Sequence, residues 1–129
     1  MKSHIILIDD NQVENLLHEQ MLRKMDEDFE ISIVDNGELA LRLLKREFSN
    51  PTSEKETIIF LDESMPDLNG LEIMEALEDM EMSEESNVQV YFLTADTSLR
   101  LIEKASIMEN VVGVIHKPLT NERLAEIIH

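Results

Sequence analysis

The sequence of 129 residues contains no cysteine and no tryptophan, only three glycines and three prolines, and 11 basic against 28 acidic residues. The absence of cysteine excludes a disulfide framework and thiolate chemistry. The formal net charge of −17 argues against a nucleic-acid partner and against anionic membrane surfaces, because binding to phosphate groups requires clustered Lys and Arg. A protein partner steered by an acidic face is compatible with this charge.

Long hydrophobic runs are also missing, since none approaches the ~18 apolar residues that a helix needs to cross a bilayer. Only four consecutive apolar residues follow His4, which is too few for a secretory signal, so we expect a cytoplasmic protein. The 43% hydrophobic and 30% charged residues fit a folded domain. We expect residues 1–129 to form this one domain, with no output domain, because the last expected helix ends with the chain.

Short apolar runs alternate along the chain with segments of helical period. This alternation is typical of a parallel sheet covered by helices, and it predicts an α/β, doubly wound fold with a five-stranded parallel sheet and five helices. The second strand alternates apolar and polar residues, as an edge strand does. The strands are expected at 5–8, 29–34, 58–61, 90–93 and 111–115.

The helices are predicted from apolar residues at helical spacing. Asn11 and Glu14 have the spacing of a capping pair at the start of the first helix. A turn signal at 35–37 precedes the second helix, and the polar segment 49–57 is expected to be a loop. The apolar residues that mark the five helices are Val13, Leu16, Leu17, Met21 and Met25; Leu39, Ala40, Leu43 and Leu44; Leu71, Met74, Leu77 and Met80; Leu101, Ile102, Ala105 and Met108; and Leu124, Ile127 and Ile128.

Polar residues follow four of the expected strands, at the point where each strand ends. The carboxyl ends of parallel strands share one edge of the sheet, where ligands bind in such folds, so these side chains should meet in one site. Clustered carboxylates raise one another's pKa, and a hard cation such as Mg²⁺ removes that penalty. The set suits a divalent cation and a phosphoryl group, and it consists of Asp9, Asp10, Asp62, Thr94 and Lys117.

Together with Met65-Pro66, Gly70 and the dipeptide Lys117-Pro118, these strand-end residues resemble the receiver domain of bacterial response regulators over essentially the whole chain. The resemblance implies the strand order 2-1-3-4-5, an order for which general descriptions of doubly wound folds already use a member of this family as an example. It also implies a stand-alone receiver in two-component or phosphorelay signalling. Such a domain is not an enzyme in the conventional sense, although it catalyses its own phosphorylation and dephosphorylation.

The resemblance further assigns a role to each site residue. Asp62 accepts a phosphoryl group from a phosphohistidine of a histidine kinase or histidine phosphotransfer protein, and the phosphorylated domain acts on a downstream target protein. Thr94 and Lys117 contact the phosphoryl group, and the Lys117-Pro118 bond is cis. Ser64 and Asp96 occupy positions that tune dephosphorylation. The Mg²⁺ ligands are Asp9, Asp10, Asp62 and the backbone carbonyl of Ser64.

The chain departs from the family pattern at one signalling position. Val114 stands three residues before Lys117, where the family usually has an aromatic side chain, so a swinging aromatic ring cannot report phosphorylation here. Movement of Thr94 toward the phosphoryl group stays possible.

Two other functions are compatible with parts of the pattern. An aspartate-nucleophile phosphohydrolase also uses an aspartyl phosphate and Mg²⁺, but such enzymes carry a second Asp where this chain has Ser64. A phosphorylation-independent adaptor with the receiver fold is the other, and Val114 favours it. Taken singly, each of the three aspartates is more simply a solvated turn residue, Thr94 a strand-end cap and Lys117 a surface charge. His18 is more simply an exposed or half-buried helix residue than a phosphorylated histidine.

Overall fold

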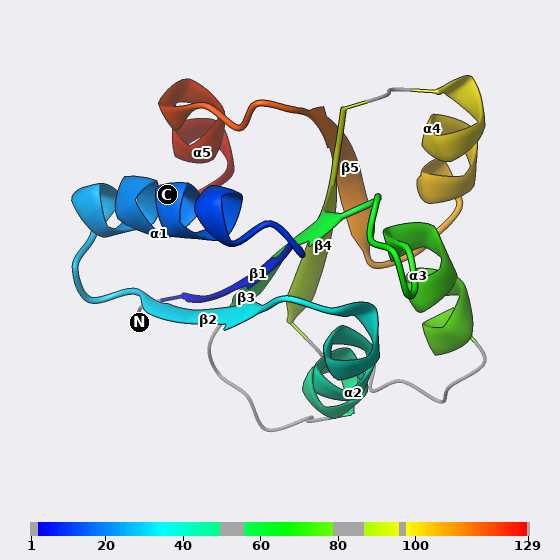
Figure 1. Ribbon diagram of the computed structural model, residues 1–129. Helices are drawn as coiled ribbons and strands as arrows, with labels where there is room; N and C mark the ends of the chain where they lie inside the picture. The colour runs from blue at the N-terminus through cyan, green and yellow to red at the C-terminus, as the bar shows by residue number, and fades with distance from the viewer. Residues whose placement is uncertain (1–2, 50–55, 79–86, 96–97, 129) are drawn as a thin grey trace.

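The computed structural model describes residues 3–49, 56–78, 87–95 and 98–128. Within them the chain forms five parallel strands in the order β2-β1-β3-β4-β5, each followed by a helix (Figure 1). The predicted doubly wound fold and its strand order are therefore confirmed. The elements are β1 His4–Ile8, α1 Gln12–Met25, β2 Glu30–Val34, α2 Gly37–Phe48, β3 Thr57–Asp62, α3 Gly70–Glu78, β4 Val88–Thr94, α4 Leu99–Ser106, β5 Val111–His116 and α5 Asn121–Ile127.

The burial of β1, β2 and β3 matches their places in the sheet. All six residues of β3 are buried, and β1 is buried from Ile5 onward, as expected for strands covered by helices on both faces. The alternating strand β2 lies at the edge of the sheet and has no fully buried residue. Asp9, Asp10 and Asp62 therefore lie at the ends of two inner strands, β1 and β3.

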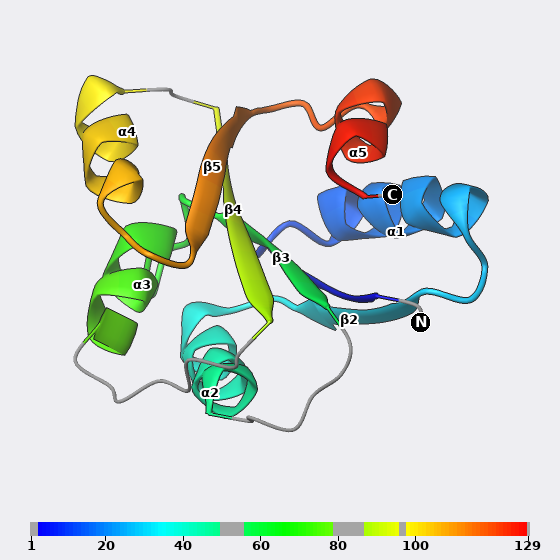
Figure 2. The same cartoon turned by 180° about the vertical axis from the view of Figure 1, so that it is seen from behind.

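The helices form two layers on opposite faces of the sheet. Figures 1 and 2 show α1 and α5 on one face and α2, α3 and α4 on the other. The apolar core is divided in the same way, with Leu22 and Leu124 in one cluster and Leu44, Ile73 and Leu101 in the other. None of the helices in the described residues is long and apolar enough to cross a membrane.

Side chains of five of the described residues cap the starts of helices, and Asn69 does so for α3, where it accepts the Glu72 N–H at 2.8 Å. Each accepts at least one backbone N–H from the first turn, which satisfies a donor that the helix itself leaves unpaired and contributes about 1 kcal/mol. Asn11 plays this part for α1, as its predicted place in a capping pair requires. The other caps are Asn36 for α2, Ser98 for α4 and Thr120 for α5.

Helix α1 turns a different face to the sheet than its apolar residues suggest. Val13 and Leu17 are 75% and 53% exposed, whereas Asn15, His18 and Leu22 are buried. The spacing correctly predicted a helix, but much of the apolar stripe lies on the solvent side. The expected exposed or half-buried position of His18 is wrong, since only 5% of the residue is exposed.

Two predictions fall partly outside the described residues. The marker Met80 of the third helix lies there, as does most of the loop predicted at 49–57. The remaining markers of the third helix lie in α3, where Met74 and Leu77 are buried. Met108, expected in the fourth helix, is buried just beyond the end of α4.

Candidate functional site

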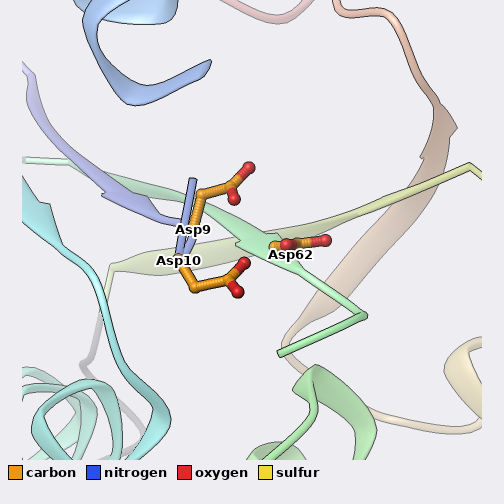
Figure 3. Close-up of side chains that lie close together, drawn as sticks. All are labelled: Asp9, Asp10 and Asp62. Atoms are coloured by element: carbon orange, nitrogen blue, oxygen red, sulfur yellow. The ribbon is translucent and has the colours of Figure 1, made fainter. Parts of the chain in front are cut away.

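Three carboxylates meet at the carboxyl-terminal edge of the sheet. Asp9 and Asp10 directly follow β1, and Asp62 is the last residue of the neighbouring strand β3, as Figure 3 shows. One oxygen from each lies within 4.8 Å of the other two. Asp9 and Asp62 are each only 2% exposed, whereas Asp10 is exposed. The predicted convergence of these three residues is therefore present, with two of the charges largely removed from water.

Asp9 is the member of this cluster whose ionisation is disfavoured. Burial, a side-chain hydrogen bond with Glu14 and the charge of Asp62 raise the pKa of Asp9 to about 8. The backbone N–H of Asn11 donates to Asp9 Oδ1 at 2.9 Å and Lys117 lies nearby, and both oppose that shift. The neutral form of Asp9 is therefore favoured near neutral pH, mainly because the carboxyl is buried.

Lys117 brings the positive charge to the cluster. It directly follows β5, and its backbone N–H donates to the carbonyl of Thr94 at 2.8 Å. Its Nζ atom lies 3.3 Å from Asp62 Oδ1 and 3.4 Å from Asp9 Oδ2. Burial lowers the pKa of Lys117, but the hydrogen bond to Glu14 and the nearby aspartates outweigh it, so the pKa lies above its ordinary value. The Lys117–Pro118 bond is cis, as the resemblance implied.

Thr94 lies at a strand end, as expected, and Ser64 lies two residues after Asp62 in the loop that follows β3. Thr94 ends β4, next to β3, and is 5% exposed. Ser64 is exposed, and its backbone N–H donates to Asp62 Oδ1 at 3.2 Å. Asp96 lies outside the described residues. Val114 is half-buried in β5 and packs against the core cluster that includes Phe92.

The loop from Glu63 to Asn69, which carries Ser64, is fixed at both ends. The Gly70 N–H donates to the Glu63 carbonyl at 3.2 Å, and the Leu71 N–H donates to Glu63 Oε2 at 3.1 Å. Farther along the loop, Asp67 accepts the backbone N–H of Gly37, at the start of α2, at 3.1 Å. These bonds hold the residues after Asp62 in place.

Sequence reasoning misjudged Glu14. It was expected to complete a capping pair, but its Oε2 atom accepts a hydrogen bond from Lys117 Nζ at 2.9 Å, and Asp9 takes the Asn11 N–H instead. The hydrogen bond with Asp9 and the ammonium of Lys117 hold the pKa of Glu14 below its ordinary value. Glu14 is therefore a fourth carboxylate of the site.

Two buried polar residues of α1 were also missed. Asn15 is 3% exposed, and its Nδ2 atom donates to the backbone carbonyl of Asp9 at 2.8 Å, which fixes the end of β1. Burial lowers the pKa of His18, one turn after Glu14. Helical spacing could have indicated that these residues are buried together, because Asn15, His18 and Leu22 lie on one face of α1.

The donor set fits Mg²⁺. All three clustered groups are carboxylates, the hard oxygen ligands that this cation prefers. Burial, and to a smaller extent the charge of Asp62, disfavour the ionised form of Asp9, and a bound cation would offset that cost.

Comparison with known proteins identifies the family. Residues 5–129 match the family described as response regulator receiver domain. The chain belongs to this family. Its members act in two-component signalling, so this receiver domain is a signalling module. No curated protein matches the chain.

Solved structures agree with this assignment. A two-component response regulator from Cytophaga hutchinsonii is 26% identical, with 98% of this chain and 95% of that one covered and a TM-score of 0.82. A CheY-like receiver domain protein from Methanospirillum hungatei JF-1 is 25% identical, with 99% and 92% covered and a TM-score of 0.72. The fold is also similar to a chain in the co-crystal structure of the Saccharomyces cerevisiae histidine phosphotransfer signalling protein Ypd1 with the receiver domain of its downstream response regulator Ssk1. That match has 21% identity, 98% and 86% coverage and a TM-score of 0.75.

Proposed function

We propose that this receiver domain accepts a phosphoryl group on Asp62 from a phosphohistidine of a partner protein, with Mg²⁺ as cofactor, and that the phosphorylated form acts on a downstream target protein. The observation that carries the proposal is the position of Lys117 Nζ, 3.3 Å from the carboxylate of Asp62, at an edge where three carboxylates converge. The family membership supports the same chemistry.

Each residue of the site has a role in this proposal. An Asp62 carboxylate oxygen attacks phosphorus, the bond from phosphorus to the donor's imidazole nitrogen breaks, and the imidazole leaves with the electron pair. Lys117 pairs with one phosphoryl oxygen, and the Thr94 hydroxyl donates to another. Such transfer depends mainly on positioning and on electrostatic stabilisation.

Mg²⁺ would neutralise charge on the phosphoryl oxygens when bound. Its proposed ligands are Asp9, Asp10, Asp62 and the Ser64 carbonyl. The ordered backbone on both sides supports this choice, because Asn15 fixes the end of β1 and Glu63 fixes the turn that follows Asp62.

A protein donor is supported by the surface beside the site. Helix α1 begins three residues after Asp9 and exposes Val13, Leu16 and Leu17. Clustered exposed apolar residues mark protein-interaction surfaces. The related Ypd1–receiver complex also contains a histidine phosphotransfer protein.

Incubation with Mg²⁺ and acetyl phosphate tests the proposal. We expect the wild-type protein to gain one phosphoryl group, measured as intact mass, and Asp62→Asn to gain none. Asp35→Asn is the matched control, because Asp35 also follows a strand but lies outside the carboxylate cluster. Absence of labelling in the folded wild-type protein would contradict the proposal.

A further inference from the structure

In the described part of the chain, Glu14 is the carboxylate that lies nearest to the ammonium of Lys117. The Oε2–Nζ distance is 2.9 Å, against 3.3 Å from Nζ to Asp62 and 3.4 Å from Nζ to Asp9. The ammonium that the proposed phosphoryl transfer requires is therefore held most closely by a carboxylate that takes no part in that transfer.

Glu14 also lies on the solvent side of the site. Its side chain is 35% exposed, whereas those of Asp9 and Asp62 are each 3% exposed. A phosphoryl group that pairs with Lys117 Nζ is brought close to this charge, because Glu14 Oε2 lies 2.9 Å from the same atom. Negative charges at that distance repel one another, most strongly where part of the surroundings is protein rather than water.

A phosphoryl group that binds Lys117 has to compete with Glu14 for the ammonium. Lys117 is the cation that the described residues place against Asp9, Asp62 and Glu14. A phosphoryl oxygen can pair fully with Lys117 only if the ammonium weakens its contact with Glu14. The free energy of that ion pair is then lost on phosphoryl binding.

We propose that Glu14 competes with the phosphoryl group for Lys117 and so slows the phosphorylation of Asp62 by acetyl phosphate. The inference rests on the proposed function of Asp62. For acetyl phosphate, the bond from Asp62 oxygen to phosphorus forms as the bond from phosphorus to acetate oxygen breaks. Acetate leaves with the electron pair, and neither Glu14 nor Lys117 exchanges a proton.

The test compares wild-type protein with Glu14→Gln, which keeps the shape of the side chain and removes its charge. We expect Glu14→Gln to be phosphorylated by acetyl phosphate and Mg²⁺ about fivefold faster, the effect of losing one partly exposed ion pair. Beryllofluoride, an analogue of the phosphoryl group, should bind about fivefold tighter for the same reason. Glu19→Gln is the matched control, since Glu19 lies on the same helix and no ion pair is seen for it among the described residues.

Ionic strength separates this role from a merely structural one. The ratio between Glu14→Gln and wild type should fall toward one as salt approaches ~1 M, where the screening length is about 3 Å. A change in packing would leave that ratio constant. Equal or slower phosphorylation of Glu14→Gln would overturn the inference while leaving the function of Asp62 intact. Failure of both proteins to be labelled would contradict the proposed function itself.

Discussion

The ammonium of Lys117 lies 3.3 Å from the carboxylate of Asp62. Lys117 directly follows β5, whereas Asp62 is the last residue of β3. The contact depends on the end of β5, where the backbone N–H of Lys117 donates to the carbonyl of Thr94 at 2.8 Å. A phosphoryl group on Asp62 would therefore form within reach of a cation that the sheet itself positions. This arrangement stabilises negative charge without rearranging the backbone.

Replacement of Lys117 by Met should slow phosphorylation by acetyl phosphate roughly 100-fold, because one preorganised donor to the phosphoryl oxygens is lost. Mg²⁺ should bind at least as tightly, since a positive charge next to the carboxylates is removed. Time courses of labelling and a Mg²⁺ titration measure the two effects. Lys104→Met is the control, because Lys104 pairs with Glu75 at 3.7 Å on α4 and α3. A variant that is labelled at the wild-type rate would exclude a role for Lys117.

Binding of Mg²⁺ should strengthen as pH rises toward about 8. The pKa of Asp9 is raised to about 8, so below that pH the cation must displace a proton. Without metal, the folded state keeps this proton while the unfolded state loses it near pH 3.8, so stability falls between those values as pH rises. Titrations between about pH 6 and about pH 8 measure the affinity, and unfolding in urea measures the stability.

Asp9→Asn is the matched variant for this pH dependence. It should bind Mg²⁺ weakly at every pH and should lose the fall in stability, because the titrating group is gone. A wild-type affinity for Mg²⁺ that is the same at both ends of the pH range would contradict the assignment.

Substitution of Gly37 by Ala should destabilise the domain by about 1–3 kcal/mol, the usual cost of overpacking. A Cβ atom at this position would lie 2.6 Å from Leu68 Cβ and 2.7 Å from the Leu68 carbonyl oxygen. Helix propensity alone would favour Ala here, so a loss of stability reports the close contact between α2 and the loop after Asp62.

Gly113→Ala is the matched control for Gly37→Ala. Among the described residues its Cβ would meet only the Tyr91 ring, at 3.8 and 3.9 Å, which is ordinary contact, so the variant should be close to wild type. Urea unfolding of the three proteins checks both expectations. Equal stability of Gly37→Ala and wild type would show that the loop around Leu68 can shift to accommodate the Cβ atom without a loss of stability.

The sequence predicted the fold and the aspartate cluster well because both depend on local patterns. Apolar runs that end in polar residues define the strands, and a parallel sheet places those ends along one edge. Asp9, Asp10 and Asp62 could therefore be grouped although β1 and β3 are far apart in sequence.

The contacts of Glu14 and the orientation of α1 could not be predicted in the same way. A Glu three residues after Asn11 has the spacing of a capping pair, but a distant partner, Lys117, outweighs that local interaction. Helical spacing pointed to the apolar residues of α1 as its buried face, whereas the structure buries the face with Asn15 and His18. The polar face is buried because Asn15 binds the end of β1, a contact that spacing alone does not show.

Trapping of the phosphorylated residue tests the central claim most directly. After incubation with acetyl phosphate and Mg²⁺, borohydride reduces an aspartyl phosphate to homoserine, which peptide mass spectrometry places in the sequence. The account predicts homoserine at position 62 in the wild-type protein and none in Asp62→Asn. Homoserine at another aspartate, or a phosphoryl group on His18 instead, would contradict it.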